Sequence, residues 1–221
     1  MTPLIRPAIA QEQVSRTLTV TGEGKQRIPT TLTDIRLGVE VSGKTATEVQ
    51  QEVAQRTSAV VDFLRSRQVE RLETTGIRLR PNYQYENNQR SLVGYIGTNT
   101  VSFRIETDAI GNLLDEAVKV GATRIDGVSF TATEEAIATA QKEALREATS
   151  DAQQQAKAVL EVLQFQSQEI INIRINGANV PTPPLVRSAE TFKNTADAQE
   201  TTPVIGGEQT VNASVTLQIR Y

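Results

Sequence analysis

Two residue types that often carry chemistry are missing from this 221-residue sequence, which has no cysteine and no histidine. Without cysteine the chain cannot form disulfides, thiolate metal sites, a thiol nucleophile or a lipoprotein anchor. Without histidine it lacks the commonest general base and the commonest ligand for zinc or iron. We therefore expect a protein that is not an enzyme, with no catalytic residue, cofactor or metal site.

Aromatic residues and long apolar runs are also scarce. Four Tyr, five Phe and no Trp are too few to indicate a stacking platform for bases. The basic residues are scattered and the net charge is −3, so nothing marks a surface for nucleic acid. No stretch approaches the ~20 consecutive apolar residues of a membrane helix. We expect a globular protein without nucleic-acid partners or a transmembrane segment.

The N-terminus carries one targeting signal. Ala8-Ile9-Ala10 before Gln11 has the small-x-small form of a signal-peptidase site. The apolar region that should precede it is absent. We interpret residues 1–14 as a tail left after signal cleavage, with a chance triplet as the alternative, and residues 15–221 as a single domain.

The longest periodic stretch runs over residues 133–163. Thr131 and Glu134 have the spacing of a capping box, and Glu134 and Glu135 would lie in the first helical turn, where the helix dipole favours acids. Small side chains along the stripe would let the helix lie close against a sheet. The apolar positions recur at three- and four-residue intervals, the period of one helical face: Ile137, Ala140, Ala144, Ala148, Ala152, Ala156, Val159 and Leu163.

Two shorter helices are expected, one capped by Thr45 and Glu48 and ending near Arg67, the other opening at Asp108 and stopped by Gly121. Alternating residues predict strands over 17–21, 34–41, 77–85, 93–105, 128–130, 171–175 and 211–221. Pro81 lacks an N–H and places its strand at a sheet edge or a bulge. We interpret Gly22-Glu23-Gly24-Lys25 as a turn, because no helix follows it and the Lys is not followed by Ser or Thr as in a phosphate loop.

Tyr83, Tyr85 and Tyr95 could form a ligand-binding cluster, but they share the parity of the aliphatic face, so we interpret them as core residues. Residues 177–209 are rich in Pro, Thr, Ala and Asn, which is typical of an exposed loop. The strand after this loop alternates cleanly. It could pair within its own sheet or add to a neighbouring subunit.

These elements follow the order ββαββαβαββ. One-sided strands favour largely antiparallel sheets, packed against one long and two shorter helices. The fold class is therefore α+β.

Several short motifs in this order resemble the SIMPL-domain family. They are Val20-Thr21-Gly22-Glu23-Gly24, Leu37-Gly38-Val39-Glu40, Gly94-Tyr95, Asn99-Thr100-Val101, Gly121-Ala122, Arg124-Ile125-Asp126-Gly127-Val128-Ser129-Phe130 and the alanines of the long helix. The resemblance implies an α+β domain, export to the periplasm or cell surface, and ring-like homo-oligomers in some members. It also implies secreted or outer-membrane-associated relatives and a loose link to stress tolerance, and it supplies no catalytic residue.

Three functions follow as hypotheses. The first is a non-enzymatic exported protein that acts by homo-oligomeric assembly or by binding protein or envelope partners. The second is a carboxylate-dependent hydrolase or a divalent-cation site, with Glu134 and Glu135, or Asp108 and Asp126, as candidates; helix N-terminal acids and turn residues are the simpler interpretation of both pairs. The third is a cytoplasmic signalling adaptor, suggested only because the family is named for a signalling molecule associated with a pelle-like kinase.

Overall fold

The computed structural model describes residues 16–86, 89–179 and 204–221. It confirms the α+β class and the order of the elements. In sequence these are β1 (Thr17–Pro29), β2 (Leu32–Gly43), α1 (Ala46–Ser66), β3 (Glu70–Glu86), β4 (Gln89–Glu106), a 3-10 turn (Thr107–Ala109), α2 (Ile110–Val120), β5 (Arg124–Thr131), α3 (Glu134–Val162), β6 (Glu169–Asn179) and β7 (Glu208–Arg220). The predicted tail over 1–14 and most of the predicted loop over 177–209 lie outside the described residues. The ends of that loop were wrongly placed, because residues 177–179 belong to β6 and residues 208–209 to β7.

The chain forms two compact units, and neither is one continuous stretch of sequence. Unit 1 takes in the described parts of residues 1–26, 138–180 and 211–221, and unit 2 those of residues 27–137 and 181–210. The single domain expected from the sequence over 15–221 stays a prediction. The two units are described separately below.

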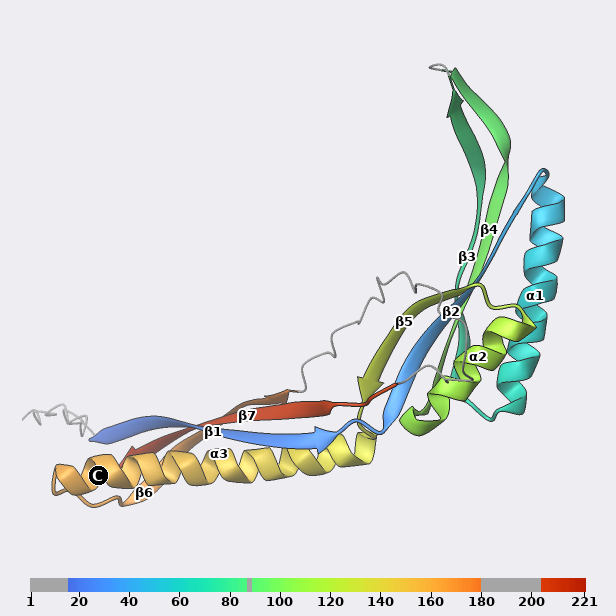
Figure 1. The fold of residues 1–221 in the computed structure, drawn as a ribbon. Helices are drawn as coiled ribbons and strands as arrows, with labels where there is room; N and C mark the ends of the chain where they lie inside the picture. The colour runs from blue at the N-terminus through green and yellow to red at the C-terminus, as the bar shows by residue number, and fades with distance from the viewer. Residues whose placement is uncertain (1–15, 87–88, 180–203) are drawn as a thin grey trace, which may run out of the picture. The chain divides into compact units, whose positions relative to one another are not determined.

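Unit 1 is a three-stranded sheet with α3 running along one face (Figure 1). The strand order β1-β7-β6 puts the C-terminal strand in the centre, antiparallel to β6. Alternate residues of β7 from Val211 to Ile219 are buried, so the clean alternation seen in the sequence marks a strand within its own sheet. β1 and β6 are the two edges.

Glycine and alanine make the contact between β1 and α3. A Cβ added to Gly22 would lie 2.1 Å from the backbone oxygen of Ala148, and one added to Gly24 would lie 1.9 Å from that of Ala144. The helix backbone therefore rests directly on the strand, as the alanine stripe predicted. The predicted turn at residues 22–25 is wrong, because these residues lie inside β1, and the glycines are there to admit the helix rather than to reverse the chain.

Two details of the predicted long helix are corrected. The N-cap is Thr133, whose hydroxyl accepts the Ala136 N–H at 3.1 Å, and not Thr131. The buried stripe runs in steps of four from Ala140 to Leu160, whereas Val159 and Leu163 are exposed. Positions four apart form a row inclined to the helix axis. The contact of α3 with the sheet therefore follows this row from Ala156 to Leu160, and not to Val159 as predicted.

Unit 2 is a four-stranded antiparallel sheet, in the order β3-β4-β2-β5, with α1 and α2 packed on it (Figure 1). Its core joins side chains of β2 and β4 to side chains of both helices. The fully or almost fully buried members include Ile35, Leu37, Val101, Phe103, Val60, Leu64, Ile110, Leu113, Leu114 and Ala117. This is the helix-on-sheet layering that the one-sided strands predicted.

The ends of the two shorter helices follow local sequence. The hydroxyl of Thr45 accepts the Glu48 N–H at 3.2 Å and begins α1, as expected. α2 begins at Ile110 after the 3-10 turn that contains Asp108. It ends at Gly121, whose φ of 132° is a conformation that favours glycine. Both helix stops were correctly predicted.

The β3–β4 hairpin is longer than the rest of its sheet. β2 ends opposite Tyr95, so residues before Tyr95 in β4 pair only with β3. We call this part, Asn82–Glu86 with Gln89–Gly94, the ribbon. The core interpretation of Tyr83 and Tyr85 is wrong, because the side chain of Tyr85 is 72% exposed and that of Tyr83 is 39% exposed. Pro81 does lie in an edge strand, as predicted.

Candidate functional site

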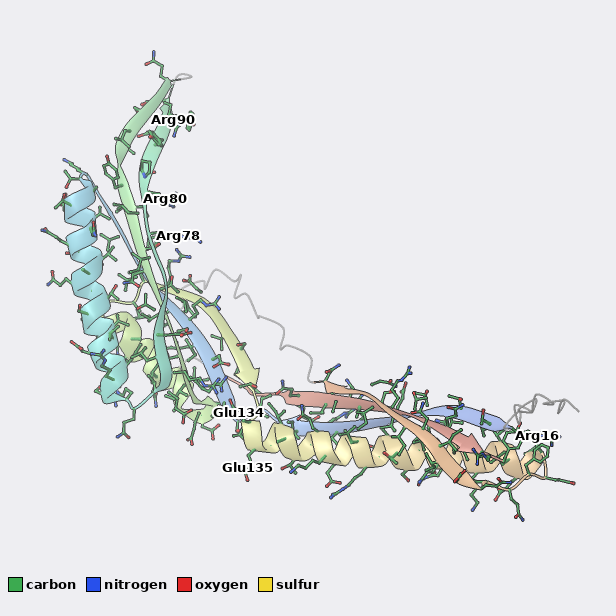
Figure 2. All side chains as sticks on the ribbon, turned by 180° about the vertical axis from the view of Figure 1, so that it is seen from behind. Arg16, Arg78, Arg80, Arg90, Glu134 and Glu135 are labelled. Atoms are coloured by element: carbon green, nitrogen blue, oxygen red, sulfur yellow. The ribbon has the colours of Figure 1, made fainter. Side chains whose placement is uncertain are left out.

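The two glutamates at the start of α3 lie on the surface (Figure 2). Glu134 forms an ion pair with Arg71 of β3, and its side chain is 79% exposed. Glu135 is exposed beside it. In the described part of the chain, no group of three or more Asp or Glu side chains is placed to hold a metal ion. The pair has the geometry of helix N-terminal acids, which the dipole stabilises.

The other candidate pair, Asp108 and Asp126, is separated along the sheet. Asp108 follows Glu106, which pairs with Leu32 at one end of β2. Asp126 is the extra residue of a bulge beside Arg36, about four residues further along β2, or roughly 13 Å of strand. Asp126 instead binds Arg124, at 2.8 Å between Oδ1 and Nη2. The structure therefore does not bring these two carboxylates together.

The sheet face of unit 2 that the helices do not cover is polar, with a hollow of about 320 Å³ between Arg36, Arg71, Glu73, Ser102 and Ser129. Its charges neutralise one another. Arg104 donates to both oxygens of Asp34 at 2.7 and 2.8 Å, and this bonding raises the pKa of Arg104 against the opposing effect of its burial. Arg104 and Asp34 form a structural ion pair. In the same hollow the Ser102 hydroxyl donates to the Glu73 carboxylate at 3.3 Å.

A second paired cation lies at the start of β5. Arg124 donates to Glu40 at 2.7 Å and to Asp126 at 2.8 Å. Burial lowers the pKa of Arg124, but the two carboxylates raise it by more, so the net direction is upward. The pKa of each of these two arginines is therefore raised above its ordinary value, so both stay cationic near neutral pH.

The ribbon is a distinct surface feature. Arg78 and Arg80 project from β3 and Arg90 lies towards the far end of the hairpin (Figure 2). The guanidinium of Arg90 stacks on the ring of Tyr83, at 3.6 Å from the ring centre. Tyr85 and Leu92 are exposed on the same hairpin. The alternation of Tyr83 and Tyr85 with polar residues predicted a core position for both, so their exposure was missed.

The second surface feature is β6, which carries four isoleucines and no buried residue. Ile173 and Ile175 are each 62% exposed, and Ile170 is 41% exposed. Their partners across the sheet, Leu217, Val215 and Ile219, are buried. Directly opposed residues lie on one face, so these isoleucines continue the apolar face beyond the part that α3 covers.

A groove lies beside this strand in unit 1. It has a volume of about 740 Å³ and is lined by Ala156, Leu160, Phe165, Ile170 and Ile219, among other residues. Polar residues of α3, such as Gln153 and Glu161, also line it. An open groove of mixed polar and apolar lining, next to an exposed apolar strand, suits a surface that binds another protein.

Sequence reasoning predicted the β6 strand but not its exposure. Alternation assigns a residue to a face, yet it does not say whether a helix covers that face. One signal was available: Ile170 and Ile171 are consecutive, and the pairing with β7 shifts at this point. Consecutive isoleucines place an apolar side chain on each face or require a bulge.

Comparison with known proteins agrees with the resemblance. The family model described as SIMPL, "Protein of unknown function (DUF541)", matches residues 18–219. "Uncharacterized protein YggE" of Escherichia coli strain K12 is 26% identical over 171 residues, covering 76% of this chain and 68% of the relative. The proteins of the same name from Escherichia coli O157:H7 and Shigella flexneri match to the same extent. Because the family model spans almost the whole chain, this protein belongs to the SIMPL family.

Proposed function

We propose that this chain is a non-enzymatic exported protein that acts through its surfaces in the periplasm or at the cell surface. It works by assembling with copies of itself or by binding envelope partners, and its role is linked to stress tolerance. The observation that carries the assembly part is the uncovered apolar strand β6, with Ile173 and Ile175 each 62% exposed. Exposed rows of isoleucine on an edge strand are normally covered by another chain.

The chemistry of the described surface supports the same proposal. Asp108 and Asp126 lie apart on the sheet, and Glu134 and Asp126 are each paired with an arginine. The most buried arginine of the open sheet face, Arg104, is held by Asp34. Charges arranged in this way stabilise a surface, whereas an active site sets unpaired groups around a reacting atom.

Export and stress tolerance have a separate basis. They rest on the family resemblance and on the small-x-small triplet at residues 8–10. The absence of cysteine is compatible with an oxidising compartment. No helix of the described residues has the length and apolar character needed to cross a membrane.

Light scattering coupled to size-exclusion chromatography tests the assembly part. The chain mass is 24.2 kDa, and at micromolar concentration we expect a discrete species with a small multiple of that mass. A single species of 24.2 kDa over the whole concentration range would contradict it.

Fractionation of the source cell tests the location. We expect the native protein in the periplasmic or surface fraction, together with a known periplasmic marker. Recovery with the cytoplasmic marker would contradict export and would favour the signalling adaptor.

A further inference from the structure

The two edges of the unit 1 sheet differ. On β1, the backbone N–H groups of Glu23 and Lys25 donate to carboxylates of α3, Asp151 and Glu147, each at 2.9 Å. The helix therefore caps this edge. On β6 the comparable contact among the described residues is one bond, from the Gln141 side chain to the Ala178 oxygen at 3.1 Å. Among the described residues, no strand pairs with the outer edge of β6.

The side chains of β6 also favour pairing with another strand. The segment Glu169–Ile175 contains four isoleucines and no proline, and its single anion and single cation cancel. Segments with strong strand preference and no net charge pair readily with copies of themselves. Edge strands that stay single in solution usually carry inward charges, prolines or bulges that prevent such pairing. β6 has two irregularities, near Ile171 and near Asn176, and the stretch Asn172–Ile175 between them is regular and contains no proline.

We propose that β6 pairs with β6 of a second copy, antiparallel across a two-fold axis near Ile173. The proposal rests on the assembly part of the proposed function and names the surface and the partner. It joins two three-stranded sheets into one continuous sheet. A two-fold contact of this kind is self-complementary, because the same patch serves both copies.

The residues of β6 fit this arrangement. With the axis at Ile173, that residue lies opposite its own copy and Ile171 lies opposite Ile175. Arg174 lies opposite Asn172, whose amide oxygen can accept from the guanidinium, so the two cations do not face each other. Ile173 and Ile175, which α3 leaves exposed, then gain apolar neighbours on the helix side of the sheet.

A single introduced cysteine tests the geometry, because the natural chain has none. In Ile173→Cys the two thiols would lie opposite each other, within reach of a disulfide or a short bis-maleimide. Ala158→Cys is the control, since Ala158 is exposed on α3 but does not line the groove. We expect Ile173→Cys to form a covalent dimer at least tenfold faster than the control at equal micromolar concentration.

A charge substitution gives an independent readout. Ile173→Lys should keep its fold, since the site is exposed. Its particle mass in light scattering should be lower than that of the wild type, because two lysines would face each other across the β6 pair. Ile77→Lys is the matched control: it is an equally exposed isoleucine, 73%, on the edge strand of the other sheet. We expect the control to keep the wild-type mass, and circular dichroism should show both variants folded.

The failures can be told apart. If the wild type is a stable 24.2 kDa monomer, both this inference and the assembly part of the proposed function fail. If the wild type is an oligomer and Ile173→Lys is the same oligomer, only the β6 pairing is overturned. If the thiol of Ile173→Cys does not react with maleimide in a monomer, another part of the same chain covers this position of β6. That result would overturn the pairing.

Discussion

At the scale of single residues, Gly22 and Gly24 decide how closely α3 approaches β1. At both positions a Cβ would lie within 2.3 Å of helix backbone atoms, well inside any real contact distance. Backbone, unlike a flexible side chain, cannot move aside without shifting the whole helix. The two glycines and the alanines facing them therefore act as one packing unit.

Replacing Gly24 with alanine tests this contact. We expect Gly24→Ala to lower the free energy of unfolding by ~1–3 kcal/mol, because the added methyl overpacks a filled site. Chemical denaturation followed by circular dichroism measures the change. Gly76→Ala is the matched control, since a Cβ there has no atom within 4 Å, and it should be neutral or stabilising by up to ~1 kcal/mol. Equal effects of the two substitutions would contradict the close approach.

Glu134 illustrates a candidate site residue with a structural explanation. Its partner Arg71 is also largely exposed, and exposed ion pairs contribute ~0–1 kcal/mol. We therefore expect Glu134→Gln to cost less than ~1 kcal/mol through the lost pair and the helix dipole. Thermal unfolding with and without calcium or magnesium should give the same ion response in both proteins. A stabilisation of the wild type by either ion that Glu134→Gln loses would instead support the divalent-cation hypothesis.

At the scale of elements, α3 provides the buried face of unit 1. Ala144, Ala148 and Ala152 are completely buried, which leaves no room for larger side chains. Ala148→Leu should lower the free energy of unfolding by ~1–3 kcal/mol through overpacking. Ala158→Leu, on an exposed part of the same helix, should change it by less than ~0.5 kcal/mol. Both substitutions are alanine to leucine on the same helix, and chemical denaturation measures both. A neutral Ala148→Leu would mean that the alanine stripe is not the packing face.

The ribbon contributes little to the core of unit 2. The two strands of the ribbon, Asn82–Glu86 and Gln89–Gly94, pair only with each other, because β2 ends opposite Tyr95. An isolated two-stranded hairpin is at best marginally stable. A variant can be made in which the residues between Asn82 and Gly94 are replaced by an Asn-Gly turn. It should still unfold cooperatively, and its free energy of unfolding should differ from that of the wild type by less than ~1 kcal/mol. Loss of the unfolding transition in calorimetry would show that the ribbon supports the core.

The elements show which features a sequence can predict. Helix and strand order, the Thr45 cap and the Gly121 stop depend on neighbouring residues, and all were predicted correctly. Gly22 and Gly24 were misread because the helix that requires them is more than 100 residues away in the sequence. Tyr85 and Ile173 were harder still, because parity gives the face of a strand while burial depends on how far the covering helix extends.

At the scale of the whole molecule, the fold is known while the function is proposed. The family and the α+β architecture are established, and the open edge of β6 is a feature of the structure. Assembly, export and the link to stress remain proposals with their own tests. They share one physical premise, namely that this chain acts by contact between surfaces, since the side chains that most reactions need are scarce or already paired.

Electron microscopy of the purified chain tests that premise most directly, because it yields the mass and the symmetry of the particle together. We expect particles that contain two copies or a multiple of two, with continuous sheet density across each pair of β6 strands. Preparations that contain only single 24.2 kDa chains, or particles in which β6 faces solvent in every copy, would contradict it.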